Sequence, residues 1–181
     1  MSERKMNYFE FYDIPVSFKP DKDLVKRKFY ALSKEYHPDF YVNEAQEKQK
    51  EILELSTLNN KAYQTLSNGN KLVAYILELS GELVEGDRYE LPPVFLMEVM
   101  ELNEALMELE FDFDADKLQE IKSNAEEIGE RLAKEQEQLM LDYDVVAEEE
   151  KSAVIKKIKD IYYRSKYLLR IKDAIHTFAS R

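Results

Sequence analysis

The sequence predicts an all-α protein in two parts: an N-terminal helical hairpin with short flanking helices, and a C-terminal antiparallel three-helix bundle. Its 181 residues include only four glycines and five prolines, too few for the turns of a many-stranded sheet. Apolar residues recur at spacings of three and four, which is typical of the buried face of a helix. Hydrophobic residues make up 44% of the chain and charged residues 35%, enough for both a core and a polar surface. We expect the first part at residues 1–80, a linker at 81–91 and the bundle at 92–181.

The first part is expected to hold four helices. A short aromatic helix over residues 7–14 stops at Pro15, because proline disfavours helix at the residue before it. Asp21 is the expected N-cap of a second helix that runs to Tyr36. Residues 43–46 look like a capping box that opens a third helix, and Asn68-Gly69-Asn70 ends it before a fourth helix at 72–79. The expected inward positions of the second and third helices are Leu24, Phe29, Leu32, Tyr36, Ile52, Leu55, Asn59, Ala62, Tyr63 and Leu66.

Three long helices are expected in the second part. Pro92-Pro93 opens the first, which runs to about Leu109, since proline is tolerated in a first turn. A second helix follows the turn at 110–114, and a third begins near Val145. Their expected inward positions are Phe95, Val99, Leu102, Leu106 and Leu109; then Leu118, Ile121, Ala125, Ile128, Leu132 and Leu139; then Val154, Ile158, Ile161, Leu168, Ile171 and Ile175.

Composition excludes several classes of function. The chain has no cysteine, so it has no disulfide, thiol catalysis or thiolate metal site. No apolar run approaches the roughly 20 residues that span a bilayer, and the charged first residues do not look like a secretory signal. We therefore expect a cytoplasmic protein that does not bind membranes.

The net charge of −11 is unevenly distributed. Residues 98–150 hold 19 acids against four bases, whereas residues 151–181 hold nine bases against two acids. Nucleic-acid binding is disfavoured, because phosphates require a basic face. The opposite charges suit antiparallel neighbours in a bundle, although solvated faces explain them equally well.

His37-Pro38-Asp39 stands at the end of the basic second helix. The tripeptide alone could be a helix-stop proline beside a capping aspartate. With helices on both sides, however, it resembles the J-domain, the module that triggers ATP hydrolysis in DnaK-class chaperones. The resemblance implies that Asp39 accepts charge-assisted hydrogen bonds from a chaperone arginine, while His37 and Pro38 fix the turn. It implies that the following residues bind the chaperone: His37, Pro38, Asp39, Lys26, Arg27, Lys28 and Lys34.

The first bundle helix carries a second apolar stripe that includes Leu96, Met100 and Met107. Packing against the N-terminal part is one explanation, and an adaptable methionine-rich binding surface is the other. Residues 95–108, together with 56–66 and 75–81, resemble HscB-type co-chaperones (the Jac family in mitochondria), which deliver an IscU-type iron–sulfur scaffold to a DnaK/HscA-class chaperone. The scaffold-binding residues implied by this resemblance are Leu96, Met97, Met100, Glu101, Glu104, Glu108 and Tyr167.

The sequence departs from these families at a few positions. Phe40 replaces the lysine that often follows the aspartate, and Asp13 replaces a common glycine at the end of the first helix. The residues between the third and fourth helices, 68–72, also differ from the family pattern. A J-protein that recruits another client, or a structural adaptor with an inert J-like fold, therefore remains an alternative.

An enzyme or metalloprotein is the least favoured class. The chain has no phosphate-binding loop, nucleophile elbow or paired-carboxylate motif. Asp173 and His176 lie one helical turn apart, but the chain has only two histidines and di-metal bundles repeat such pairs. We expect no catalytic residue, no metal and no cofactor.

Overall fold

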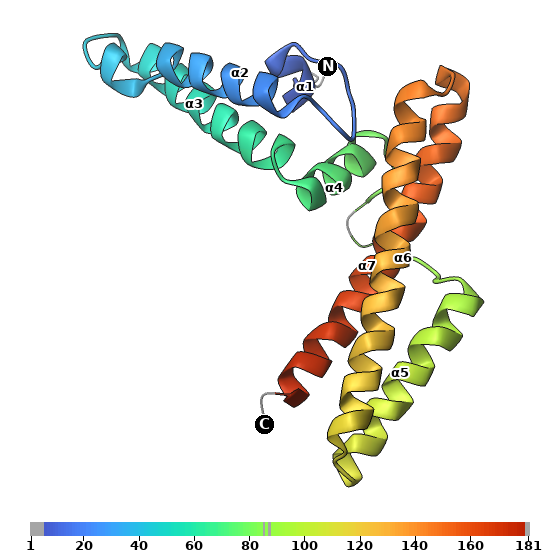
Figure 1. Ribbon diagram of the computed structural model, residues 1–181. Coiled ribbons are helices and arrows are strands. Elements are labelled where there is room, and N and C mark those ends of the chain that lie inside the picture. Colours follow the sequence, from blue (N-terminus) through green and yellow to red (C-terminus); the bar gives the residue numbers. More distant parts are fainter. Residues whose placement is uncertain (1–5, 85, 87, 180–181) are drawn as a thin grey trace. The chain divides into compact units, whose positions relative to one another are not determined.

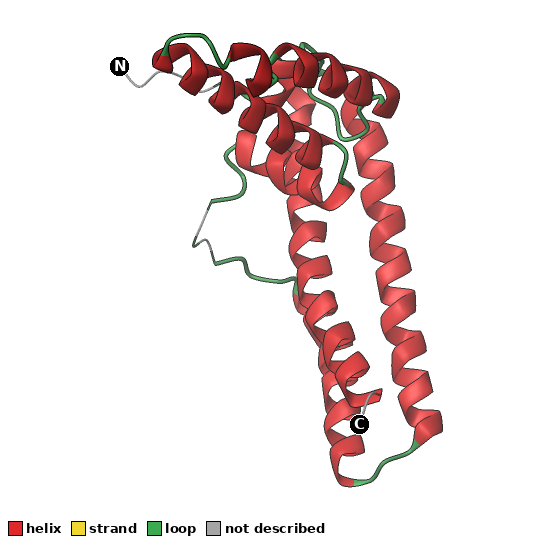
Figure 2. Ribbon diagram, turned by 90° about the vertical axis from the view of Figure 1, so that its left-hand side faces the viewer, coloured by secondary structure: helices red, strands yellow, loops and turns green. Residues whose placement is uncertain are grey.

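The computed structural model describes residues 6–84, 86 and 88–179, so part of the expected linker and both chain ends lie outside the described residues. Within the described residues every regular element is helical, as Figure 2 shows, which confirms the all-α fold class. The chain divides into two compact units, Met1–Leu79 and Ser80–Arg181. No described helix is both long enough and apolar enough to cross a membrane.

The first unit is a helical hairpin with short helices at one end (Figure 1). Helices α2 (Lys22–Glu35) and α3 (Gln46–Leu66) form the hairpin, and the short 3-10 helix η1 (Pro38–Tyr41) lies in the turn between them. Helices α1 (Tyr8–Tyr12) and α4 (Gly69–Leu79) pack at the other end, where the rings of Tyr8 and Tyr75 stack 4.4 Å apart. The hairpin therefore holds its turn away from the aromatic end of its own unit.

A buried asparagine joins three helices of this unit. The Asn59 side chain accepts a hydrogen bond from the Tyr12 hydroxyl at 2.9 Å and donates to the Ser33 hydroxyl at 2.9 Å and the Phe29 carbonyl at 3.1 Å. Asn59 is the only buried polar residue within the described part of the chain. Since buried polar groups require partners, these bonds fix how α1 and α2 meet α3.

The observed helix starts correct one prediction and confirm another. The capping box at residues 43–46 is wrong: α3 begins after Ala45, with no side-chain cap, and the Gln49 amide instead donates to the carbonyls of Val42 and Glu44. A capping box does occur at α1, between Asn7 and Glu10. At α2 the predicted N-cap is confirmed, because Asp21 accepts from two backbone amides of the first turn.

The predicted buried face of α2 omits Val25. Val25 is the fully buried residue of this helix, whereas Leu24 is only partly buried. Phe29, Leu32 and Tyr36 continue from Val25 at spacings of four, three and four, and all three are partly buried. The four predicted residues are thus all partly buried, and the prediction missed the one residue of α2 that is fully buried.

The second unit comprises α5 (Pro93–Phe111), α6 (Ala115–Val145) and α7 (Glu148–Ala179). The third helix begins at Glu148 rather than near Val145, which is the last residue of α6. Of the predicted inward positions, all are buried except Leu118 and Leu139, which are partly buried. Helix α5 runs beside only part of the longer α6–α7 pair (Figure 1). The prediction of a three-helix bundle is confirmed.

The segment before α5 packs against α7. The ring of Tyr89 stacks on Tyr163 at 4.4 Å, and its hydroxyl donates to the Asp160 carboxylate at 2.5 Å. Burial, followed by the hydrogen bond and negative charge of Asp160, raises the pKa of the Tyr89 hydroxyl. Glu82 also pairs with Lys159 at 3.4 Å. The described part of the expected linker therefore belongs to the second unit.

Candidate partner-binding surfaces

The His37-Pro38-Asp39 turn arises because proline stops α2. Helix α2 ends at Glu35, Tyr36 is its C-cap, and His37 is extended with φ −74° and ψ 121°. Pro38 then occupies the first position of η1, where its missing N–H breaks no helical hydrogen bond. The residues that follow α2 therefore form a tight turn.

Three local hydrogen bonds hold this turn in shape. The Asp39 amide donates to His37 Nδ1 at 3.3 Å, and the Phe40 amide donates to the His37 carbonyl at 3.1 Å. The Tyr41 hydroxyl reaches back to the carbonyl of Glu35 at 2.9 Å. The Asp39 side chain is 82% exposed. The imidazole therefore supports the turn, while the carboxylate faces solvent and is available to a partner.

Phe40 places an exposed ring beside this carboxylate. Its ring lies 5.4 Å from that of His37, and its side chain is exposed. Where many J-domains have a lysine, this chain therefore presents an apolar surface.

The basic residues of α2 do not share one face. Lys26, Arg27 and Lys34 are exposed and point outward on the same side of the helix, a set we call the basic face. Lys28 is about 200° around the helix from Lys26. It is less exposed and lies 3.9 Å from the Asp13 carboxylate. The structure thus brings together three of the four basic residues that the sequence singled out.

Of the bundle residues expected to bind a scaffold, Tyr167 lies on α7 and the other six lie on α5. Met97 and Met100 are exposed, and Leu96 is partly buried. Tyr167 of α7 is partly buried, packs against the bundle core and meets the edge of Phe95 at 6.3 Å. We call Leu96, Met97 and Met100, which are neighbours on α5, the apolar patch; Tyr167 lies on α7 against the inward-facing Phe95.

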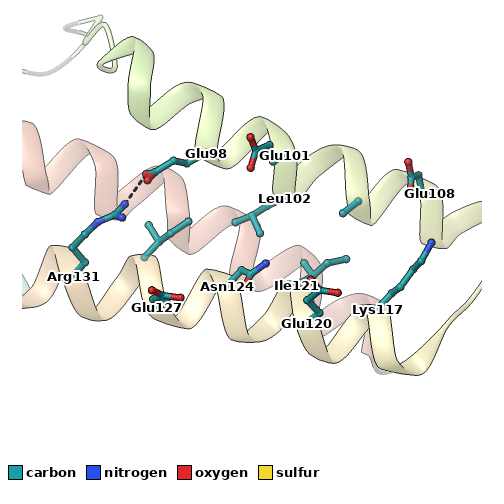
Figure 3. A pocket seen from close by; sticks show the side chains of 12 residues that line it. Glu98, Glu101, Leu102, Glu108, Lys117, Glu120, Ile121, Asn124, Glu127 and Arg131 are labelled. Atoms are coloured by element: carbon teal, nitrogen blue, oxygen red, sulfur yellow. Dashed lines mark hydrogen bonds and ion pairs between the residues drawn. The ribbon is translucent and has the colours of Figure 1, made fainter.

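Glu101 and Glu108 lie beside this patch, whereas Glu104, one helical turn after Met100, continues its outward face. Glu101 and Glu108 line a groove of about 400 Å³ between α5 and α6, as Figure 3 shows. In the same groove Glu98 pairs with Arg131 at 2.6 Å. Glu104 is exposed and does not line the groove. Two of the three expected glutamates therefore form one acidic border of α5, on the α6 side.

Comparisons with known proteins agree on one family. Residues 91–176, which span most of the second unit, match the family model of the HSCB C-terminal oligomerisation domain. The structure resembles chaperone HscB from Vibrio cholerae, with a TM-score of 0.57 and 27% identity over 94% of this chain and 99% of that one. It also resembles human co-chaperone HscB, with a TM-score of 0.65 and 26% identity over 98% of this chain and 84% of that one. The second unit therefore matches the HscB C-terminal domain, and the chain resembles HscB proteins over nearly its whole length.

Curated HscB relatives are more similar in sequence over shorter segments. The Vibrio cholerae co-chaperone HscB homologue is 36% identical over 102 residues, which is 56% of this chain and 60% of that protein. HscB of Buchnera aphidicola is 43% identical over 76 residues, 42% of this chain and 44% of that protein. The chain thus matches about half of the length of these relatives.

The structure explains one departure from the HscB pattern. Asp13, which replaces a common glycine, is the C-cap of α1 and has a left-handed backbone with φ 51°. Glycine adopts this conformation without strain, and aspartate tolerates it better than most other residues. The role of Asn59 as a polar link between helices was not predicted, although an asparagine at an inward helical position was a signal for it. No cluster of potential metal ligands occurs among the residues that the structure describes, Asp173 and His176 included.

Proposed function

We propose that this chain is a non-enzymatic co-chaperone of the HscB family. It stimulates the ATPase of a DnaK/HscA-class chaperone through His37-Pro38-Asp39 and delivers an IscU-type iron–sulfur scaffold to it. The observation that carries the proposal is the presence, in one chain, of an exposed His-Pro-Asp turn and a second unit that matches the HscB C-terminal model.

The geometry of the turn supports the chaperone half of the proposal. Asp39 presents an exposed carboxylate on a backbone that the hydrogen bonds of the turn already fix. A preorganised acceptor loses little conformational entropy on binding, and a bond from an arginine to a carboxylate is stronger than a neutral one. The exposed basic face beside it suits an acidic surface on the chaperone and steers the encounter.

The bundle supports the delivery half. Exposed methionines adapt to a partner's shape, and the neighbouring glutamates favour a partner with basic residues around its apolar contact. Truncating such apolar anchors commonly costs above about 1 kcal/mol each when they lie at the centre of an interface.

The chaperone half is tested with the chaperone and the IscU-type scaffold of the same organism. Asp39→Asn and His37→Gln should remove stimulation of ATP hydrolysis but leave scaffold binding intact. Glu47→Gln, an exposed acid-to-amide change on nearby α3, is the matched control and should behave as wild type. If folded His37→Gln still stimulates hydrolysis, the J-domain function is wrong.

The delivery half is tested separately. Leu96→Ala combined with Met100→Ala should abolish scaffold binding and preserve stimulation of the chaperone by the co-chaperone alone. Unchanged scaffold binding, or a wild-type protein that binds no scaffold, would favour a J-protein that serves another client.

A further inference from the structure

Two exposed apolar side chains, Phe40 and Val42, belong to the same turn as Asp39. Phe40 is 67% exposed and Val42 is 63% exposed. Tyr41, between them, is partly buried, and its hydroxyl donates to the Glu35 carbonyl at the end of α2. Exposed apolar side chains that gather in one place are typical of a binding surface, and the proposed function gives these two no role.

The geometry of η1 divides the residues of this turn among three sides. A 3-10 helix has three residues per turn, so side chains three positions apart share a side. The pairs that share a side are Pro38 with Tyr41, Asp39 with Val42, and His37 with Phe40. The first pair turns back toward α2 through the Tyr41 hydroxyl, and the rings of the third pair lie 5.4 Å apart. Each of the other two sides therefore combines a polar residue of the turn with an exposed apolar one.

We propose that Phe40 and Val42 are contact residues for the chaperone: both are covered when the chaperone binds the Asp39 carboxylate, and they make part of the binding insensitive to salt. The inference rests on the proposed function, because it concerns the same partner. It adds an apolar contact to the turn and the basic face.

A protein that binds Asp39 also covers its two apolar neighbours. Val42 lies on the same side of η1, about 6 Å along the axis at about 2 Å per residue. The Cα atoms of Asp39 and Phe40 are consecutive and therefore about 3.8 Å apart. A standard interface covers about 800 Å² of each partner, a footprint roughly 30 Å across. Both apolar side chains lie well inside such a footprint when it is centred on Asp39.

Covering these side chains also strengthens the contact of the carboxylate. Apolar side chains around a polar contact exclude water, and a hydrogen bond is stronger in less polar surroundings. Many J-domains have a lysine where this chain has Phe40, and salt screens the charge of a lysine. A phenylalanine ring has no charge to screen. Phe40 and Val42 therefore add affinity that salt does not remove, whereas salt weakens the contribution of the basic face.

The test measures stimulation of the chaperone's ATPase over a range of co-chaperone concentrations. Phe40→Ser and Val42→Ser should each raise the half-saturating concentration at least about fivefold, and the double variant by more than about tenfold. The rate at saturation should stay near the wild-type value, because Asp39 is unchanged, whereas Asp39→Asn should lower that rate. The fold increase should be the same at low and at high salt, because burial of apolar surface is not screened.

Two control variants separate a contact from a structural effect. Val16→Ser changes a residue that is 40% exposed in the loop between α1 and α2, at the other end of the hairpin, and should behave as wild type. Phe40→Leu keeps an apolar side chain but removes the ring contact with His37, and should stay within about twofold of wild type. Thermal unfolding should be unchanged in all the serine variants, because the substituted side chains are exposed.

The possible outcomes separate the inference from the proposed function. If Asp39→Asn removes stimulation but neither Phe40→Ser nor Val42→Ser raises the half-saturating concentration, the apolar contact is wrong and the proposed function stands. If Phe40→Leu is as weak as Phe40→Ser, Phe40 acts through His37 and the contact is wrong at that position. A wild-type chain that does not stimulate the chaperone overturns both. A dimer of the free chain that dissociates in the double variant, with stimulation unchanged, would assign the two side chains to self-association and overturn the inference.

Discussion

Asn59→Ala should destabilise the first unit more than any surface change near it. The substitution removes one hydrogen bond from the Tyr12 hydroxyl and two bonds to α2, at Phe29 and Ser33. A buried hydrogen bond contributes a net of about 1 kcal/mol, so three bonds correspond to about 3 kcal/mol. For a unit of this size, 1 kcal/mol shifts the Tm by roughly 4–8 °C, so the unit's transition should fall by at least about 12 °C.

The assay must resolve the two units within the intact chain. Differential scanning calorimetry gives the transition, and hydrogen exchange read by peptide assigns the loss to α2 and α3. Peptides of α6 and α7 serve as the internal reference. Asn60→Ala is the matched control, since Asn60 is the exposed neighbour of Asn59 on the same helix.

A shift of less than about 4 °C in Asn59→Ala would refute this reasoning, because it corresponds to less than one net hydrogen bond. Equal shifts for Asn59→Ala and Asn60→Ala would refute it as well. In that case an effect common to both substitutions, rather than the buried contacts of Asn59, would account for the shift.

Three further predictions concern exposed or linking residues. Asp13→Gly should stabilise the first unit by up to about 1 kcal/mol, because it relieves a left-handed aspartate, and no rise in Tm would contradict this. Tyr89→Phe should speed hydrogen exchange in the segment before α5. The pKa of the Tyr89 hydroxyl is raised in the folded protein above its unfolded value of about 10. The stability that this hydroxyl contributes is therefore complete below about pH 10 and is lost as the pH rises through the folded pKa. Tyr89→Phe should not show this loss. Reversing Lys26 and Arg27 to glutamate should weaken chaperone binding in a salt-dependent way, whereas Lys28→Glu should weaken it less; equal effects would show that the basic face is not the contact.

Interior positions of the long helices could be predicted from the sequence because spacing translates directly into geometry. All five expected inward residues of α5, from Phe95 to Leu109, are buried. On α2 the prediction missed the fully buried Val25, although Val25, Phe29 and Leu32 fit the helical period. The information was present in the pattern.

Helix ends were harder to predict because their signals are short and compete. Asn43 precedes a helix but does not cap it, since the chain reaches Ala45 before it turns helical. The break between α6 and α7 has neither glycine nor proline, so the start of α7 was misplaced by three residues. The position of each glutamate relative to α6 depends on which face of α5 the helix α6 covers. The sequence of α5 by itself does not show that face.

The energetics of the proposed stimulation can be stated for one residue. A co-chaperone that performs no chemistry accelerates hydrolysis only by binding the hydrolysis-competent chaperone more tightly than the resting one. A tenfold shift in that equilibrium needs about 1.4 kcal/mol of differential binding. One charge-assisted hydrogen bond contributes about 1.5–3 kcal/mol. If only the hydrolysis-competent chaperone offers a donor to the exposed Asp39 carboxylate, this one bond shifts the equilibrium about ten- to a hundredfold. The loss of stimulation in Asp39→Asn should therefore exceed its loss of affinity for the resting chaperone, because the carboxylate contributes mainly where the donor is in place.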